Sequence, residues 1–143
     1  MGSVKGDDAQ TSGVSYTRLA GNVHRLTFYR ADRLASDEAL SIYRRILKGH
    51  DPTVPLKLLV DTRKSGVPSV RYLFSGLRSL YRWHNGTLPE IHVAYLYQDA
   101  IMLTMARPLL ELLKVNATRE YFLGSAYDEA LEWVRTQASS ARR

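Results

Sequence analysis

The chain has 143 residues, of which 45% are hydrophobic and 24% are charged, and it carries a formal net charge of +6 without any cysteine. These values are typical of one globular domain, and they exclude wholesale disorder, disulfide bonds, thiolate metal sites and a cysteine nucleophile. The apolar runs are far shorter than a membrane span, so we expect a cytoplasmic protein without membrane contact.

The excess of basic residues is compatible with a nucleic acid, an acidic lipid or an acidic protein partner. Much of it lies in the C-terminal Arg-Arg pair and in arginines scattered over predicted helix faces, and not in one dense block. No recognised nucleic-acid motif accompanies the charge, and aromatic residues are not interleaved with the basic ones. We therefore rank the hypothesis of a basic nucleic-acid-associated domain below the functional hypotheses that follow.

The domain organisation is simple. Residues 1–14 read as a flexible polar leader, residues 15–137 as a single α/β domain, and residues 138–143 as a flexible tail. Two strands, 15–19 and 23–30, flank a turn at Gly21-Asn22 and predict a hairpin. Ser36 is expected to cap a helix that ends near Gly49, and residues 56–60 form an apolar strand buried on both faces.

The second half alternates helices and strands. Pro68 suits the first turn of a helix that runs towards Gly86, and residues 91–97 and 119–123 read as strands. Asp99 is expected to cap the helix between them, and Ser125 with Asp128 to start the last helix, in which Trp133 should be partly buried.

The resulting order, β-β-α-β-α-β-α-β-α, predicts an α/β fold with a mostly parallel sheet and an antiparallel N-terminal hairpin at one edge. The strand 91–97 should be interior, because it is apolar on both faces. The loops after strands 56–60, 91–97 and 119–123 should meet on one rim of the sheet, where open α/β sheets usually bind their ligands.

The element order, together with the stretches LKLLVDTR, IHVAYLYQDA and REYFLGSAYDEALEWV, resembles the STAS fold of anti-sigma-factor antagonists, and more narrowly their SpoIIAA-like relatives. The resemblance covers residues 16–134. Its most specific part is the ending that contains Phe122, Glu129, Ala130, Leu131 and Trp133. It implies a STAS (SpoIIAA-like) fold and a non-catalytic regulatory domain that binds a partner.

The loop after the third strand departs from that family. In the switch-type members it carries an Asp-Ser-(Ser/Thr)-Gly motif whose serine a partner kinase phosphorylates, whereas here it reads DTRKSGVPS. Ser65, followed by Gly66, and Ser69, at the expected helix start, are the candidate phosphoacceptors, but neither restores the motif.

The same loop has the chemistry of an anion site. Free N–H groups at the start of the following helix, with Arg63 and Lys64 beside them, favour a phosphate or carboxylate. The predicted binding set comprises Asp61, Arg63, Lys64, Ser65, Ser69, Arg71 and Asp99. Because Asp61 would repel an anion, we expect it to turn into the loop.

An enzyme is the main rival reading, with Asp61 and Asp99 as acid and base acting on an anionic substrate at the rim. It ranks lower because no convergent pair of titrating groups is visible. The four histidines lack metal-ligand spacing and no glycine-rich nucleotide loop occurs, so we expect no catalytic residue, metal or cofactor. The expected partner is a protein or a small anionic ligand, and a homodimer stays open.

Overall fold

The computed structural model describes residues 12–66, 68–113 and 115–138. One sheet runs through its centre in the order β1-β2-β3-β4-β5. β1 pairs with β2 antiparallel, and the other neighbours are parallel. The strands are β1 Val14–Leu19, β2 Val23–Phe28, β3 Leu56–Asp61, β4 Ile91–Tyr97 and β5 Ala117–Leu123. The predicted α/β class, the antiparallel edge and the interior position of residues 91–97 are confirmed.

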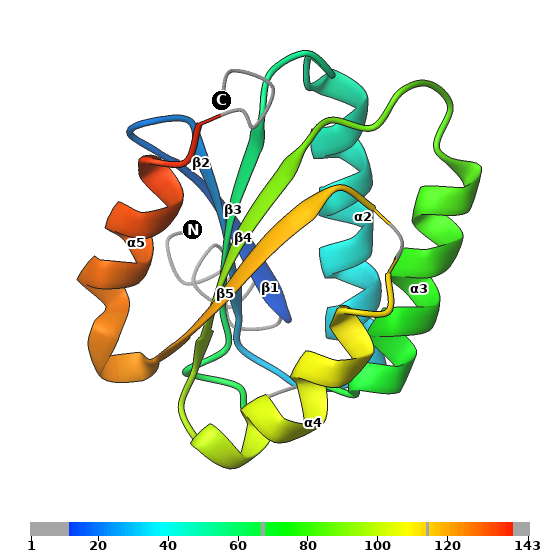
Figure 1. The fold of residues 1–143 in the computed structure, drawn as a ribbon. Helices are drawn as coiled ribbons and strands as arrows, with labels where there is room; N and C mark the ends of the chain where they lie inside the picture. The colour runs from blue at the N-terminus through cyan, green and yellow to red at the C-terminus, as the bar shows by residue number, and fades with distance from the viewer. Residues whose placement is uncertain (1–11, 67, 114, 139–143) are drawn as a thin grey trace, which may run out of the picture.

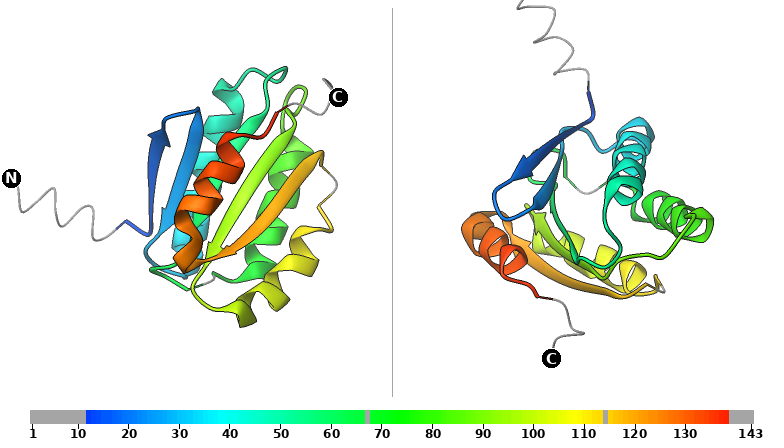
Figure 2. Two further views of the ribbon diagram at one scale, coloured as in Figure 1. Left: turned by 60° about the vertical axis from the view of Figure 1, so that its left-hand side comes forward. Right: turned by 90° about the horizontal axis from the view of Figure 1, so that it is seen from above.

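Helices cover both faces of the sheet. The helices are α2 Arg33–Gly49, α3 Val70–Trp83, α4 Ala100–Leu110 and α5 Tyr127–Arg135, with a short 3-10 turn, η1 Gly124–Ala126, before α5. α2, α3 and α4 lie against one face, and α5 lies against the other (Figures 1 and 2). Within the described ranges, no helix is both long and apolar enough to cross a membrane. The predicted order of strands and helices is confirmed.

Strand alternation divides the core between the two faces. On β4, Val93 and Tyr97 pack with the clusters under α2, α3 and α4, whereas Ala94 and Leu96 pack under α5. Successive side chains of a strand point to opposite faces, so an interior strand covered on both sides must be apolar throughout. Trp133 of α5 is partly buried beside Phe122, with ring centroids 6.2 Å apart, as predicted.

The chain reverses between β1 and β2 at Gly21 and Asn22, whose φ angles of 82° and 61° are the left-handed values that these two residue types tolerate best. β1 begins at Val14, and the N–H of Gly13 donates to Glu38 at 2.9 Å, so ordered structure starts within the predicted leader. The rest of that leader, and the tail from residue 139, lie outside the described residues.

Three predicted helix starts are wrong. The first helix begins at Arg33, where the Asp32 carboxylate accepts from the Ala35 N–H at 2.9 Å. Ser36 instead lies inside the helix on its buried face, too late to cap it. A capping side chain acts only from the position just before the first helical residue.

The other two starts differ for related reasons. Pro68 precedes the cap of α3 and is not in its first turn; the N-cap is Ser69, whose Oγ accepts from the Tyr72 N–H at 3.4 Å. Ser125 belongs to η1, and the residue before α5 is Ala126, which makes no side-chain cap. The tight 3-10 turn therefore takes the place of the predicted capping box.

Candidate anion-binding rim

The loops that follow β3, β4 and β5 meet at the carboxyl ends of the strands, and we call this edge the rim. It lies at the bottom of Figure 1, beside α4. The three loops enclose an open hollow of about 580 Å³. Its lining comprises Arg63, Lys64, Gln98, Leu123, Gly124 and Ser125. The predicted meeting of the three loops is thus present, and it forms a concave surface.

Arg63, in the loop after β3, forms a two-pronged ion pair with Asp61, the last residue of that strand. Arg63 Nε donates to Asp61 Oδ1 at 2.9 Å, and Nη2 donates to Oδ2 at 2.8 Å. The Arg63 N–H adds a third bond to Oδ1 at 3.0 Å. The Asp61 side chain is only 4% exposed, so it is turned away from the hollow and held by its neighbour. This geometry fixes the shape of the loop.

The protonation of Asp61 follows from the same contacts. Burial alone would raise the pKa of its carboxyl, but the hydrogen bonds and charge of Arg63, with the charge of Arg25, outweigh burial and hold the pKa below its usual value. A carboxylate that is fully ionised and occupied by a guanidinium is a poor general base near neutral pH. Asp61 therefore acts here as a positioning group for the loop.

Arg63 also ties the β3 loop to the start of α5. Its guanidinium carbon lies 4.8 Å from the centre of the Tyr127 ring, and the Tyr127 hydroxyl accepts from Arg25 Nη1 at 2.9 Å. The alternation of β2 already places Arg25 on the face opposite Leu26. The sequence gives no sign, however, that this face would meet Tyr127, which is 102 residues away.

Lys64 is the exposed cation of the rim. Its ammonium lies 5.1 Å from the centre of the Tyr29 ring, which orients the side chain without neutralising its charge. Within the part of the chain that the structure describes, no carboxylate forms an ion pair with Lys64. Its charge is therefore available to a ligand.

The remaining predicted binding residues do not line the hollow. Ser65 Oγ donates to the Gly66 carbonyl oxygen at 2.6 Å, and Ser69 caps α3. Arg71 is exposed in the first turn of α3, and Asp99 is exposed just before α4. Four lining residues were not predicted to bind. Leu123 is the last residue of β5, and Gln98, Gly124 and Ser125 come just after the ends of β4 and β5.

Among the described residues, no group of three or more His, Asp or Glu side chains could hold a metal ion. Comparisons of this chain with protein-family models, with curated proteins and with solved structures find no match.

Proposed function

We propose that this chain is a non-catalytic regulatory or ligand-binding domain of the STAS (SpoIIAA-like) kind that recognises an anionic group at its rim. The anionic group is carried by a partner protein or is a small anion. The observation that carries the proposal is the hollow between the three rim loops, whose lining includes two cations and no carboxylate.

The charges behind the hollow favour an anion. Arg25 and Arg63 both act on the single buried carboxylate of Asp61, so one positive charge of this group remains uncompensated. Lys64 adds a second positive charge at the surface. Ser125 and Gln98 supply neutral hydrogen-bonding groups beside it. A ligand with negative oxygens gains charge-assisted hydrogen bonds at such a surface, and these are the stronger class of hydrogen bond.

The STAS-like assignment is supported by the element order and by the helix α5, whose Ala130, Leu131 and Trp133 pack in the cluster beneath the sheet. In that setting, Ser65 and Ser69 stay the predicted phosphoacceptors. A phosphate on Ser69 would lie at the positive end of α3, where a negative charge is tolerated. It would therefore change the rim without unfolding the helix.

The test is isothermal calorimetry with inorganic phosphate and with a phosphoserine peptide, on the unmodified chain and on two variants. Lys64→Ala removes the exposed rim cation. Lys48→Ala, the matched control, removes an exposed lysine from the last turn of α2, away from the rim. We expect Lys64→Ala to weaken phosphate binding about tenfold, which corresponds to about 1.4 kcal/mol, and Lys48→Ala to leave it unchanged.

Four outcomes separate the alternatives. Tighter binding of the peptide than of phosphate indicates a partner protein, and equal binding indicates a small anion. Equal affinities in Lys64→Ala and Lys48→Ala would contradict the rim site. A phosphatase or esterase activity that disappears in Asp61→Asn, with the fold intact, would contradict the non-catalytic reading.

A further inference from the structure

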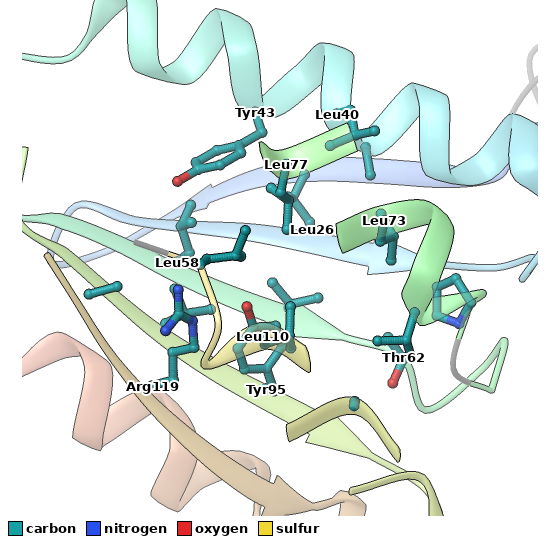
Figure 3. Close-up of a pocket in the computed structure, with 18 of the residues that line it drawn as sticks. Leu26, Leu40, Tyr43, Leu58, Thr62, Leu73, Leu77, Tyr95, Leu110 and Arg119 are labelled. Carbon is teal, nitrogen blue, oxygen red and sulfur yellow. The ribbon is translucent and has the colours of Figure 1, made fainter. Parts of the chain in front are cut away.

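A second cavity lies inside the molecule, between the sheet and the helices α2, α3 and α4 (Figure 3). Its volume is about 100 Å³. Its lining is almost entirely aliphatic and aromatic, with Leu26, Leu58, Leu73, Leu77 and Leu110 around its middle. An apolar cavity of this kind stays dry or takes up a small apolar molecule, because water finds too few hydrogen-bond partners there.

One charged side chain interrupts the apolar lining. Arg119 comes from the edge strand β5, and its guanidinium points into the cavity beside the Tyr95 hydroxyl (Figure 3). Tyr95 forms a hydrogen bond with Arg119. Across the described ranges, no carboxylate forms an ion pair with this arginine. A partly buried cation without a counter-charge is costly, so the site favours an anionic guest.

Two further hydroxyls lie near the same charge. Tyr43 and Tyr81 place their hydroxyl oxygens 2.6 Å apart at the cavity wall. In such a pair one hydroxyl donates to the other, so one proton of the two is left to donate elsewhere. Among the described residues, neither hydroxyl makes a further hydrogen bond. The cavity thus combines one cation and a spare hydroxyl donor with an apolar body.

We propose that this cavity binds a short-chain monocarboxylate, with its carboxylate on Arg119 and its hydrocarbon chain among the leucines. An apolar cavity of about 150 Å³ holds a benzene molecule, so a cavity of about 100 Å³ has room for a hydrocarbon chain of about four carbon atoms, as in pentanoate. A single negative charge balances the single cation of the lining. A dicarboxylate or a phosphate ester would leave a second charge without a partner in an apolar space.

The cavity is separate from the rim site. Lys64 does not line it, and the Asp61–Arg63 pair lies on the other face of the sheet, towards α5. Thr62 and Pro68 line one end of the cavity, and the Thr62 hydroxyl is already used, since it donates to the Leu96 carbonyl oxygen at 2.7 Å. Failure of one site therefore leaves the other proposal standing.

The experiment is calorimetry on the full chain with pentanoate and with its neutral analogue pentan-1-ol. We expect pentanoate to bind with a dissociation constant of about 1 mM or lower and at least tenfold more tightly than the alcohol. Arg119→Met should abolish that preference and leave binding of the alcohol unchanged. Arg107→Met is the matched control, because Arg107 is an exposed arginine of α4 outside the cavity lining. It should keep the preference, as should Lys64→Ala.

The proposal is overturned if the unmodified chain binds pentanol as tightly as pentanoate, or binds neither. It is also overturned if Arg119→Met and Arg107→Met reduce pentanoate binding equally. If Arg119→Met fails to fold, Arg119→Lys decides between the outcomes. Because lysine keeps the positive charge, a retained preference for pentanoate in that variant supports a charge-based site, and loss of the preference in the folded variant contradicts it.

Discussion

At the scale of single residues, the rim contains two kinds of cation with different roles. Arg63 is held by a nearly buried carboxylate, whereas Lys64 is exposed and unpaired within the described chain. Removing one partner of a largely buried pair leaves the other charge unsatisfied, and removing an exposed lysine does not. The two residues are adjacent in sequence. Breaking the Arg63 pair should lower stability, whereas removing Lys64 should lower anion binding and leave stability nearly unchanged.

We expect Asp61→Asn to lower the free energy of unfolding by about 2 kcal/mol, and Lys64→Ala to change it by less than about 0.5 kcal/mol. Because the pKa of Asp61 is lowered in the fold, its contribution is complete above the unfolded value near 4 and is lost as the pH falls below it. Urea unfolding at pH 7 and at pH 3 measures both effects. Equal stability of Asp61→Asn and the unmodified chain at pH 7 would show that the pair is only a surface contact.

His24 predicts a second pH effect. Its ring is buried, and its Nδ1 lies 2.6 Å from the Tyr16 hydroxyl. Burial, with the charges of Arg18 and His50, lowers its pKa from 6.5 to about 4. The unfolded chain therefore binds a proton that the folded chain does not, so stability should be full above pH 6.5 and fall between pH 6.5 and about 4. His24→Phe should lose less stability over this interval. If the urea midpoint of His24→Phe falls with pH as steeply as that of the unmodified chain, His24 is excluded as the cause.

At the scale of elements, α2 offers a direct comparison between a true and a false cap. Asp32 accepts the Ala35 N–H, so Asp32→Ala should destabilise the protein by about 1 kcal/mol. Ser36 is fully buried, and its hydroxyl has no hydrogen-bond partner among the described residues. Ser36→Ala removes this unsatisfied group and raises helix propensity, so it should be neutral or stabilising by about 0.5 kcal/mol. Thermal unfolding of the two variants measures this difference. If Ser36→Ala were the less stable variant, Ser36 and not Asp32 would be the cap.

The same helix shows why element order could be predicted and helix ends could not. The apolar period of residues 39, 43 and 47 is local, so it identifies the helix and its buried face. Its start depends on which of two polar residues, Asp32 or Ser36, precedes the first helical residue, and both satisfy the local rule. Ser36 is buried in the folded protein, so Asp32 caps the helix. This burial is a tertiary effect that local sequence does not show.

At the scale of the whole molecule, the candidate sites differ in how far they could be predicted. Asp61 ends a strand, and Arg63 and Lys64 follow it. The carboxyl ends of parallel strands are where α/β sheets bind ligands, so the rim could be predicted from the sequence. The contact of Arg25 with Tyr127 depends on the packing of α5 over the sheet, which local patterns do not specify. Arg119 was missed because it lies on an edge strand, where alternation identifies two faces but not the one that is buried.

The most direct test of the rim as the binding surface is a titration of backbone amide resonances with inorganic phosphate. We expect saturable shifts at the rim residues Lys64, Gln98, Gly124 and Ser125, with little change in α2 and β1. These shifts should weaken in Lys64→Ala and persist in Arg119→Met, which alters only the inner cavity. Saturable shifts confined to other surfaces, or rim shifts that are the same in Lys64→Ala, would contradict the rim as the anion-binding surface.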